Sequence, residues 1–157
     1  MTIWRPHSSI RAKAIGLPWR DGRFLAARVT EDSGRIKGVR PLGGTIEFGE
    51  TWQQALIREF KEELAVEISI SGPPQVFENI YHHEGQPGHE IIFAANVTLP
   101  KLPRLDMEDI SFKEGNGMIW TAGWYTLEDL EAGGLELYPT GLKEELRNST
   151  VLKRDTN

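Results

Sequence analysis

The segment from residue 43 to residue 66 constrains the fold of this chain more than any other part of the sequence. Thr51 and Gln54 have the spacing of a capping box, in which each side chain bonds the backbone N–H of the other residue, and this predicts the start of a helix. Apolar residues then recur at helical spacing and predict its buried face: Trp52, Ala55, Leu56, Phe60 and Leu64. We therefore expect an amphipathic helix that packs against a hydrophobic core.

Three glutamates lie on one side of the expected helix, because Glu59 precedes Glu62 by three residues and Glu63 by four. Like charges at this spacing repel by a few tenths of a kcal/mol per pair, and the helix dipole disfavours anions in the last turn by roughly 0.3–1 kcal/mol each. A divalent cation such as Mg²⁺ would turn the repelling carboxylates into ligands. A solvated charged face, with Arg58 and Lys61 as local partners, explains the same residues without a function.

The loop before this helix is rich in glycine. Gly43 and Gly44 permit backbone conformations closed to other residues and a close approach of a ligand to the main chain. Gly49 precedes Glu50 and the helix start, where free N–H groups favour anions. A lone Gly-Gly pair would indicate only a turn, but loop and helix together indicate a site for ions or phosphates.

Loop and helix resemble the Nudix box, written G-x5-E-x7-R-E-U-x-E-E-x-G-U with U a bulky apolar residue. The matching residues are Gly44, Glu50, Arg58, Glu59, Phe60, Glu62, Glu63 and Val66. Each fixed residue type occurs at roughly one position in fifteen to twenty, so six fixed matches arise by chance on the order of 10⁻⁷ per starting point. Weaker similarity, for example at residues 124–130, extends the resemblance over most of the chain.

The sequence departs from the box once, with Ala65 where the family has glycine. Alanine in a left-handed conformation costs about 1 kcal/mol or more. We therefore expect the chain to leave the helix by another path, with Ala65 at negative φ.

The resemblance implies an α/β fold of the α+β kind, an α/β/α sandwich with a mixed β-sheet between helices and the box as a loop–helix–loop. Hydrophobic patterning predicts strands at residues 10–17, 24–29, 38–42, 66–70, 76–81 and 90–97. Residues 71–74, Ser-Gly-Pro-Pro, are expected to separate two of these strands. Further helices are expected at residues 126–132 and 140–147, and a flexible loop at 101–109.

The resemblance also implies the roles of the box residues. Glu59, Glu62 and Glu63 would bind one to three divalent ions, with Mg²⁺ the natural cofactor and Mn²⁺ a possible substitute. The backbone carbonyl of Gly43 would be a further ligand, and Glu50 an accessory or water-mediated one. Arg58 would pair with a box carboxylate and hold the loop against the helix.

Such a site implies a hydrolase that cleaves a phosphoanhydride bond of a nucleoside diphosphate linked to another moiety, by attack of metal-activated water on phosphorus. The general base is left open between Glu59 and a carboxylate from a later segment. Glu90 and Glu114 are the candidates for that later carboxylate and for substrate binding, although isolated glutamates are more often surface residues.

Histidines and aromatic residues outside the box carry weaker hypotheses. His82, His83 and His89 flank one expected hairpin loop, but their spacing matches no familiar zinc site. Residues that could stack on a base, although aromatics are more often core, are Trp4, Trp19, Tyr81, Trp120 and Trp124.

Length and composition limit the class of protein. A chain of 157 residues forms one ordinary domain, expected over residues 1–157 with the box at 44–66, and the absence of cysteine excludes a disulfide scaffold. The formal net charge of −5 disfavours nucleic acid as a partner. No stretch approaches the ~20 apolar residues of a membrane span. We expect a cytoplasmic protein with a small nucleotide-type substrate, no nucleic-acid or membrane partner, and a homodimer left open.

Two other functions remain to be separated from catalysis. A catalytically weak or inactive module with the same fold could bind or sense nucleotides, and the loss of a box carboxylate would favour it, but none is lost. A small Ca²⁺-binding or scaffolding protein is the second alternative. Its EF-hand loop would need alternating Asp or Asn oxygens before a Glu, and the sequence contains no such loop.

Overall fold

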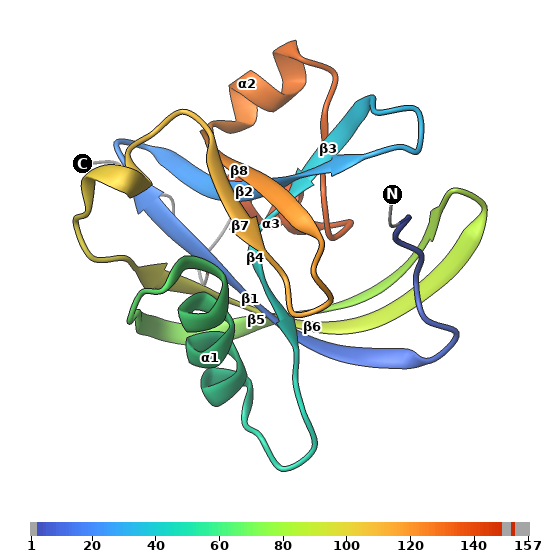
Figure 1. Cartoon of the computed structure of the whole chain (residues 1–157), viewed down its shortest axis with the longest axis horizontal. Coiled ribbons are helices and arrows are strands. Elements are labelled where there is room, and N and C mark those ends of the chain that lie inside the picture. The colour runs from blue at the N-terminus through green and yellow to red at the C-terminus, as the bar shows by residue number, and fades with distance from the viewer. Residues whose placement is uncertain (1–2, 149–151, 153–157) are drawn as a thin grey trace.

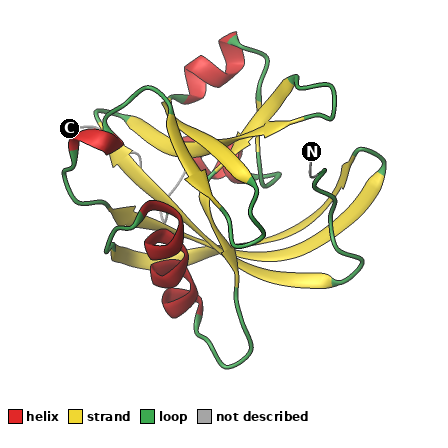
Figure 2. Cartoon of the chain, in the orientation of Figure 1, coloured by secondary structure: helices red, strands yellow, loops and turns green. Residues whose placement is uncertain are grey.

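The computed structural model describes residues 3–148 and residue 152, and these form a large mixed β-sheet with helices packed on it (Figure 1). The strands are β1 Ile10–Arg20, β2 Arg23–Thr30, β3 Ile36–Arg40, β4 Leu42–Thr45, β5 Ser69–His83, β6 Gln86–Thr98, β7 Ile110–Lys113, β8 Ile119–Tyr125 and β9 Glu136–Leu137. The helices are α1 Trp52–Leu64, α2 Leu127–Ala132 and α3 Leu142–Asn148, with a 3-10 turn at Pro103–Leu105. The predicted fold class is confirmed, and Figure 2 shows how strands dominate it.

Strand β1 joins the two halves of the sheet. Along most of its length it runs parallel to β6, and its middle, Lys13 to Gly16, also pairs antiparallel with β4. Its end forms a hairpin with β2, where Trp19 pairs with Phe24 across a turn at Asp21 and Gly22, both at positive φ. Beyond β2, the sheet continues into β3 and β9 on one side and into β8 and β7 on the other.

Strands β5 and β6 form a long hairpin, and here the expectation of two strands separated at residues 71–74 is wrong. The chain runs as one strand over Ser69–His83, and its pairing register shifts between Ser71 and Gln75. Proline has no N–H to give to a neighbouring strand, and a bulge accommodates Pro73 and Pro74 without ending the strand. The strand also begins at Ser69 rather than at residue 66.

Strands β7 and β8 were not expected from the sequence. In β7, Ile110 and Phe112 are buried while Ser111 and Lys113 are exposed, so the alternation was present but only four residues long. The pairing of β7 with β8 supplies the context that so short a pattern lacks.

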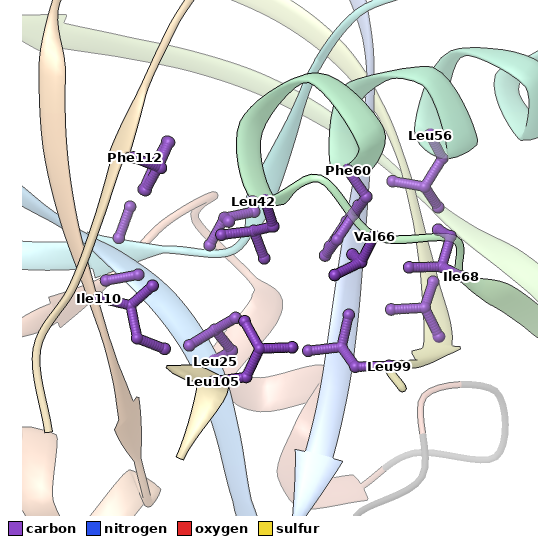
Figure 3. Close-up of a cluster of buried hydrophobic side chains, with 14 of the residues drawn as sticks. Leu25, Leu42, Leu56, Phe60, Val66, Ile68, Leu99, Leu105, Ile110 and Phe112 are labelled. Atoms are coloured by element: carbon purple, nitrogen blue, oxygen red, sulfur yellow. The ribbon is translucent and has the colours of Figure 1, made fainter. Parts of the chain in front are cut away.

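Helix α1 begins as predicted, with both hydrogen bonds of the Thr51–Gln54 capping box in place. Its buried face packs against the strands, as Figure 3 shows for Leu56 and Phe60, which lie in one cluster with Leu25 and Leu99. This packing fixes which side of the helix remains free for the glutamates.

The helix exit contradicts the expectation for Ala65, which adopts the left-handed conformation with φ of 54° and ψ of 42°. Its N–H bonds the carbonyl oxygen of Lys61 at 3.0 Å, and Arg104 donates to the carbonyl oxygen of Leu64 at 2.7 Å. The next residue, Val66, is buried in the core. These contacts hold the chain in a left-handed helix exit and offset the cost of the β-carbon at positive φ.

A second hydrophobic cluster lies away from α1 and includes α2 and α3. It gathers Phe24, Leu127, Leu130, Leu142 and Leu146, among others. Helix α2 begins at the capping box of Thr126 and Asp129, close to the predicted start, and α3 covers most of the expected range 140–147. Within residues 3–148, no helix has the length and apolar character required to cross a membrane.

Candidate active site

A cavity of about 760 Å³ opens beside the glycine-rich loop and runs along the inner face of strands β1, β5 and β6. It brings together most of the predicted site residues: Gly43, Arg58, Glu59, Glu62, Glu63, Glu90 and Glu114 line it. Glu50 lies outside this lining. The two later carboxylates, which are far from the box in sequence, thus share one cavity with it.

Arg58 connects the loop to the helix. It contacts both carboxylate oxygens of Glu50 at 2.7 and 2.9 Å, and it donates to Glu59 at 2.9 Å. It also reaches Glu62 at 3.3 Å and the carbonyl oxygen of Thr45 at 3.0 Å. The expected pairing of Arg58 with a box carboxylate is therefore present, and hydrogen bonds from Arg58 lower the pKa of Glu50 to about 2.

Gly43 and Gly44 were expected in a loop, but both lie in strand β4, where they pair with Ile15 and Ala14 of β1, and close packing requires them. A β-carbon at Gly44 would lie 2.3 Å from the carboxyl carbon of Glu59, and one at Gly43 would lie 2.0 Å from the carbonyl oxygen of Ala14. Any larger residue would therefore displace Glu59 or strand β1.

Glu63 lacks a partner for one of its carboxylate oxygens. Its Oε2 atom is buried and accepts no hydrogen bond from the described residues. Burial is the main cause that raises the pKa of Glu63 to about 9, and burial also raises the pKa of the neighbouring Glu59. An unsatisfied carboxylate oxygen beside further carboxylates fits a hard cation such as Mg²⁺, which takes oxygen ligands.

The carboxylates of the box do not form a complete metal site in this structure. Within residues 3–148, no three acidic or histidine side chains converge closely enough to hold an ion as they lie. Arg58 explains this, because it occupies oxygens of both Glu59 and Glu62. The donor types suit Mg²⁺, and binding it would require these carboxylates to exchange contacts with Arg58.

Two further ion pairs line the cavity. Lys13 lies 3.2 Å from Oε1 of Glu90, and Arg40 contacts Glu114 at 2.9 Å. The Arg40 guanidinium also sits over the ring of Trp120, 4.7 Å from its centroid. Burial lowers the pKa of Lys13.

The N-terminal segment also lines the cavity with Ile3, Trp4, Pro6 and His7. In Figure 1 this segment lies near the turn between β5 and β6. Trp4 contacts the ring of His83 edge-on at 5.2 Å, and Arg5 pairs with Asp32. The ring of His83 also lies 2.7 Å from Nζ of Lys37. The three histidines considered for zinc do not form a metal-binding cluster among the described residues.

The structure separates the aromatic candidates for base stacking. Trp4, Tyr81 and Trp120 line the cavity, whereas Trp19 and Trp124 do not. Trp19 donates to Asn96, and Trp124 donates to the carbonyl oxygen of Leu105.

Reasoning from the sequence missed the cavity residues Lys13, Arg40 and Asn79. The sequence did contain a signal for Lys13. It lies on the same face of its strand as the buried Ile15 and Leu17, and a charged side chain on a buried face requires a partner of opposite charge. For the other two residues, the sequence offered no comparable signal.

Comparisons with known proteins agree with this fold. The family model described as the NUDIX domain matches residues 11–145. A NUDIX hydrolase from Nitrosomonas europaea is similar in structure, with a TM-score of 0.57, 19% identity, and coverage of 87% of this chain and 85% of that one. A MutT protein from Methanosarcina mazei Go1 gives a TM-score of 0.51 at 18% identity and covers 91% of this chain and 92% of that one. No curated protein matches the sequence.

Proposed function

Since the chain belongs to the Nudix family of pyrophosphohydrolases, we propose that it is a Mg²⁺-dependent hydrolase that cleaves a phosphoanhydride bond in a nucleoside diphosphate linked to another moiety. The observation that carries the proposal is the unpartnered Oε2 atom of Glu63, which lies in a cavity that also receives Glu59 and Glu62. Burial raises the pKa of Glu63 to about 9, so this carboxyl group carries a proton at neutral pH unless a cation takes the proton's place and stabilises the charged form.

In the proposed reaction, Glu59, Glu62 and Glu63 hold the cation, with the carbonyl group of Gly43 as a further ligand and Glu50 as an accessory carboxylate. When bound there, Mg²⁺ neutralises phosphate oxygens and lowers the pKa of a coordinated water. The support from this chain is the common cavity that four of these five residues line.

Arg58 keeps the glycine loop docked on α1 in this proposal. Its bonds to Glu50 and to the carbonyl oxygen of Thr45 fix the loop, and its weaker 3.3 Å contact with Glu62 is the one most easily exchanged for a cation. Arg58 is therefore a positioning residue that sets where the carboxylates stand.

Proton removal from the attacking water needs a base, for which Glu59 and Glu114 are the proposed candidates. Glu114 shares the cavity with Glu63, and its charge contributes to the raised pKa of Glu63. Glu90 is less suited, because Lys13 and the hydroxyl group of Tyr81 both contact its Oε1 atom.

A substrate panel tests the proposal. Nucleoside triphosphates, ADP-ribose, dinucleoside polyphosphates and nucleotide sugars would each be incubated with the protein and Mg²⁺, and the nucleotide products, such as the nucleoside monophosphate, measured by chromatography. At least one compound should be hydrolysed, and exhaustive chelation with EDTA should abolish the reaction. Turnover that persists after chelation, with no residual metal by elemental analysis, would contradict the metal dependence.

A further inference from the structure

Unsatisfied polar atoms gather in the cavity. Among the described residues, four buried side-chain polar atoms lack a hydrogen-bond partner, and all four belong to residues that line this one cavity: Glu63, Asn79, His89 and Trp120. Buried polar groups in folded proteins are nearly always paired. Such a concentration indicates that a ligand supplies the missing partners.

Asn79 is the most informative of the four, because it lies outside the carboxylate motif. It sits on β5 and is 5% exposed, with its Oδ1 atom unpartnered. It stands opposite Glu90 in the β5–β6 ladder, so the two side chains project from the same face as direct neighbours. Neither the capping nor the packing of any element explains a buried amide here.

Glu90 offers a second acceptor beside it. Lys13 approaches its Oε1 atom at 3.2 Å, and the hydroxyl group of Tyr81 donates to the same atom at 2.9 Å. Within the described residues, no hydrogen bond reaches Oε2 of Glu90. Two acceptors, Oδ1 of Asn79 and Oε2 of Glu90, are therefore available side by side.

The charges and the unpartnered atoms together select the kind of ligand group. Lys13 already balances Glu90, and Arg40 already balances Glu114. Arg11 stands opposite Glu90 in the β1–β6 ladder and also lines the cavity, so charge alone does not exclude a phosphate. The unpartnered atoms, however, are both acceptors; an ionised phosphate brings only further acceptors, whereas a group with several N–H or O–H donors would satisfy both. The rings of Tyr81 and Trp120 line the same cavity and favour a flat, aromatic group.

We propose that Asn79 and Glu90 form a specificity subsite that accepts hydrogen bonds from the amino-bearing edge of a nucleobase. Adenine, cytosine and guanine carry such an amino group, whereas uracil and hypoxanthine present a carbonyl oxygen in its place. The inference rests on the proposed function in taking the ligand to be derived from a nucleotide, and it adds which part of the substrate is read and by which residues.

Binding of free nucleosides tests the subsite separately from catalysis. Isothermal titration calorimetry would compare cytidine with uridine and adenosine with inosine. In each pair an amino group is exchanged for a carbonyl group, and the ring nitrogen beside it changes from an acceptor to an N–H donor, so the keto member offers one ring N–H in place of the two amino hydrogens. The wild-type protein should bind at least one amino-bearing member about 10-fold more tightly than its keto counterpart. Asn79→Leu should remove most of this preference, and Asn79→Asp, which retains an acceptor at this position, should keep it.

Glu78→Leu is the matched control, because Glu78 precedes Asn79 on the same strand and is exposed on the opposite face. This control should bind like the wild type. Thermal unfolding shows whether the variants fold, and Asn79→Leu should hold or raise the melting temperature because it removes a buried, unpartnered amide.

Three results would overturn the subsite. One is equal affinity for both members of each pair. Another is an affinity that depends on the ribose instead, with 2′-deoxycytidine bound as weakly as uridine, which would assign the acceptors to sugar hydroxyl groups. The third is an absence of nucleoside binding in a protein that hydrolyses the substrate panel. Selective binding without any hydrolysis would support the subsite and contradict the proposed reaction.

Discussion

Two groups of charged residues differ in how their charges are met; we call the part of the cavity beside α1 the outer end and the part beside β1, β5 and β6 the inner end. At the outer end, Arg58 contacts Glu50, Glu59 and Glu62, and the neighbouring Glu63, on which the charge of Arg40 also acts, has an oxygen with no hydrogen-bond partner. At the inner end, Lys13 and Glu90 form one ion pair, and Arg40 and Glu114 form another.

This difference indicates which part of a substrate each end of the cavity can bind. An excess of carboxylates needs a cation, so the outer end fits chemistry on phosphates. Balanced pairs need no counter-charge, so the inner end fits an uncharged part of the substrate. One cavity can thus hold the reacting phosphates at one end and the group that identifies the substrate at the other.

The largest expected effect is on turnover. Glu63→Gln should lower kcat at least ~100-fold, because it removes the charge of a proposed ligand. The melting temperature without metal should hold, because burial raises the pKa of Glu63 to about 9 and its protonated carboxyl group is already uncharged at neutral pH. Steady-state kinetics and thermal unfolding measure the two effects.

Glu67→Gln controls for the loss of a carboxylate in the same region. Glu67 is exposed and pairs with Lys61 away from the cavity, so its variant should keep the wild-type kcat. If Glu63→Gln hydrolyses substrate at the wild-type rate, or unfolds, the role assigned to Glu63 is wrong.

A smaller effect, on the stability of the fold, is expected from breaking the ion pair of Lys13 and Glu90 at the inner end. Lys13→Met should destabilise the protein by roughly 2–3 kcal/mol, because it leaves the carboxylate of Glu90 enclosed without its counter-charge. The double variant Lys13→Met with Glu90→Gln should recover at least half of this loss. Urea unfolding of the wild type, both single variants and the double variant gives the coupling energy.

Additive losses in that cycle would contradict the balanced pair. The contrast between the two ends would be supported by two results together. The double variant should recover stability relative to Lys13→Met, and Glu63→Gln should lose no stability relative to the wild type.

The smallest expected effect lies at the helix exit that positions the outer carboxylates. Ala65→Gly should stabilise the protein by about 1 kcal/mol, because it removes the strain of a β-carbon at a φ of 54°. The urea midpoint should rise at unchanged slope. A fall in the midpoint would show that the flexibility of glycine in the unfolded chain outweighs the strain.

The outer end was predictable from sequence because its residues are neighbours along one helix and one loop. Helical spacing places Glu59, Glu62 and Glu63 on one side, and the capping box at Thr51 places the helix start. The path of Ala65 was not predictable, because it depends on contacts from distant residues such as Arg104.

The inner end could not be assembled from sequence for a related reason. Lys13, Asn79 and Glu90 come from three strands, and their meeting depends on the register of β1 with β6 and of β6 with β5. The pairing register depends on how whole strands pack, so it cannot be read from the alternation of residues within one strand. The misplaced break at Pro73 and Pro74 has the same origin, because the pairing of β5 with β6 continues on both sides of the prolines.

Metal binding measured through stability tests most directly the claim that the outer end carries unmatched negative charge. Thermal unfolding would be followed with and without Mg²⁺ in the absence of substrate, for the wild type, Glu63→Gln and Glu67→Gln. At about 100 times the dissociation constant, Mg²⁺ should stabilise the wild type by about 2.7 kcal/mol, a rise in Tm of roughly 5–10 °C. The rise should persist in Glu67→Gln and fall below about 2 °C in Glu63→Gln. No rise in the wild type, or an equal rise in all three proteins, would contradict the account.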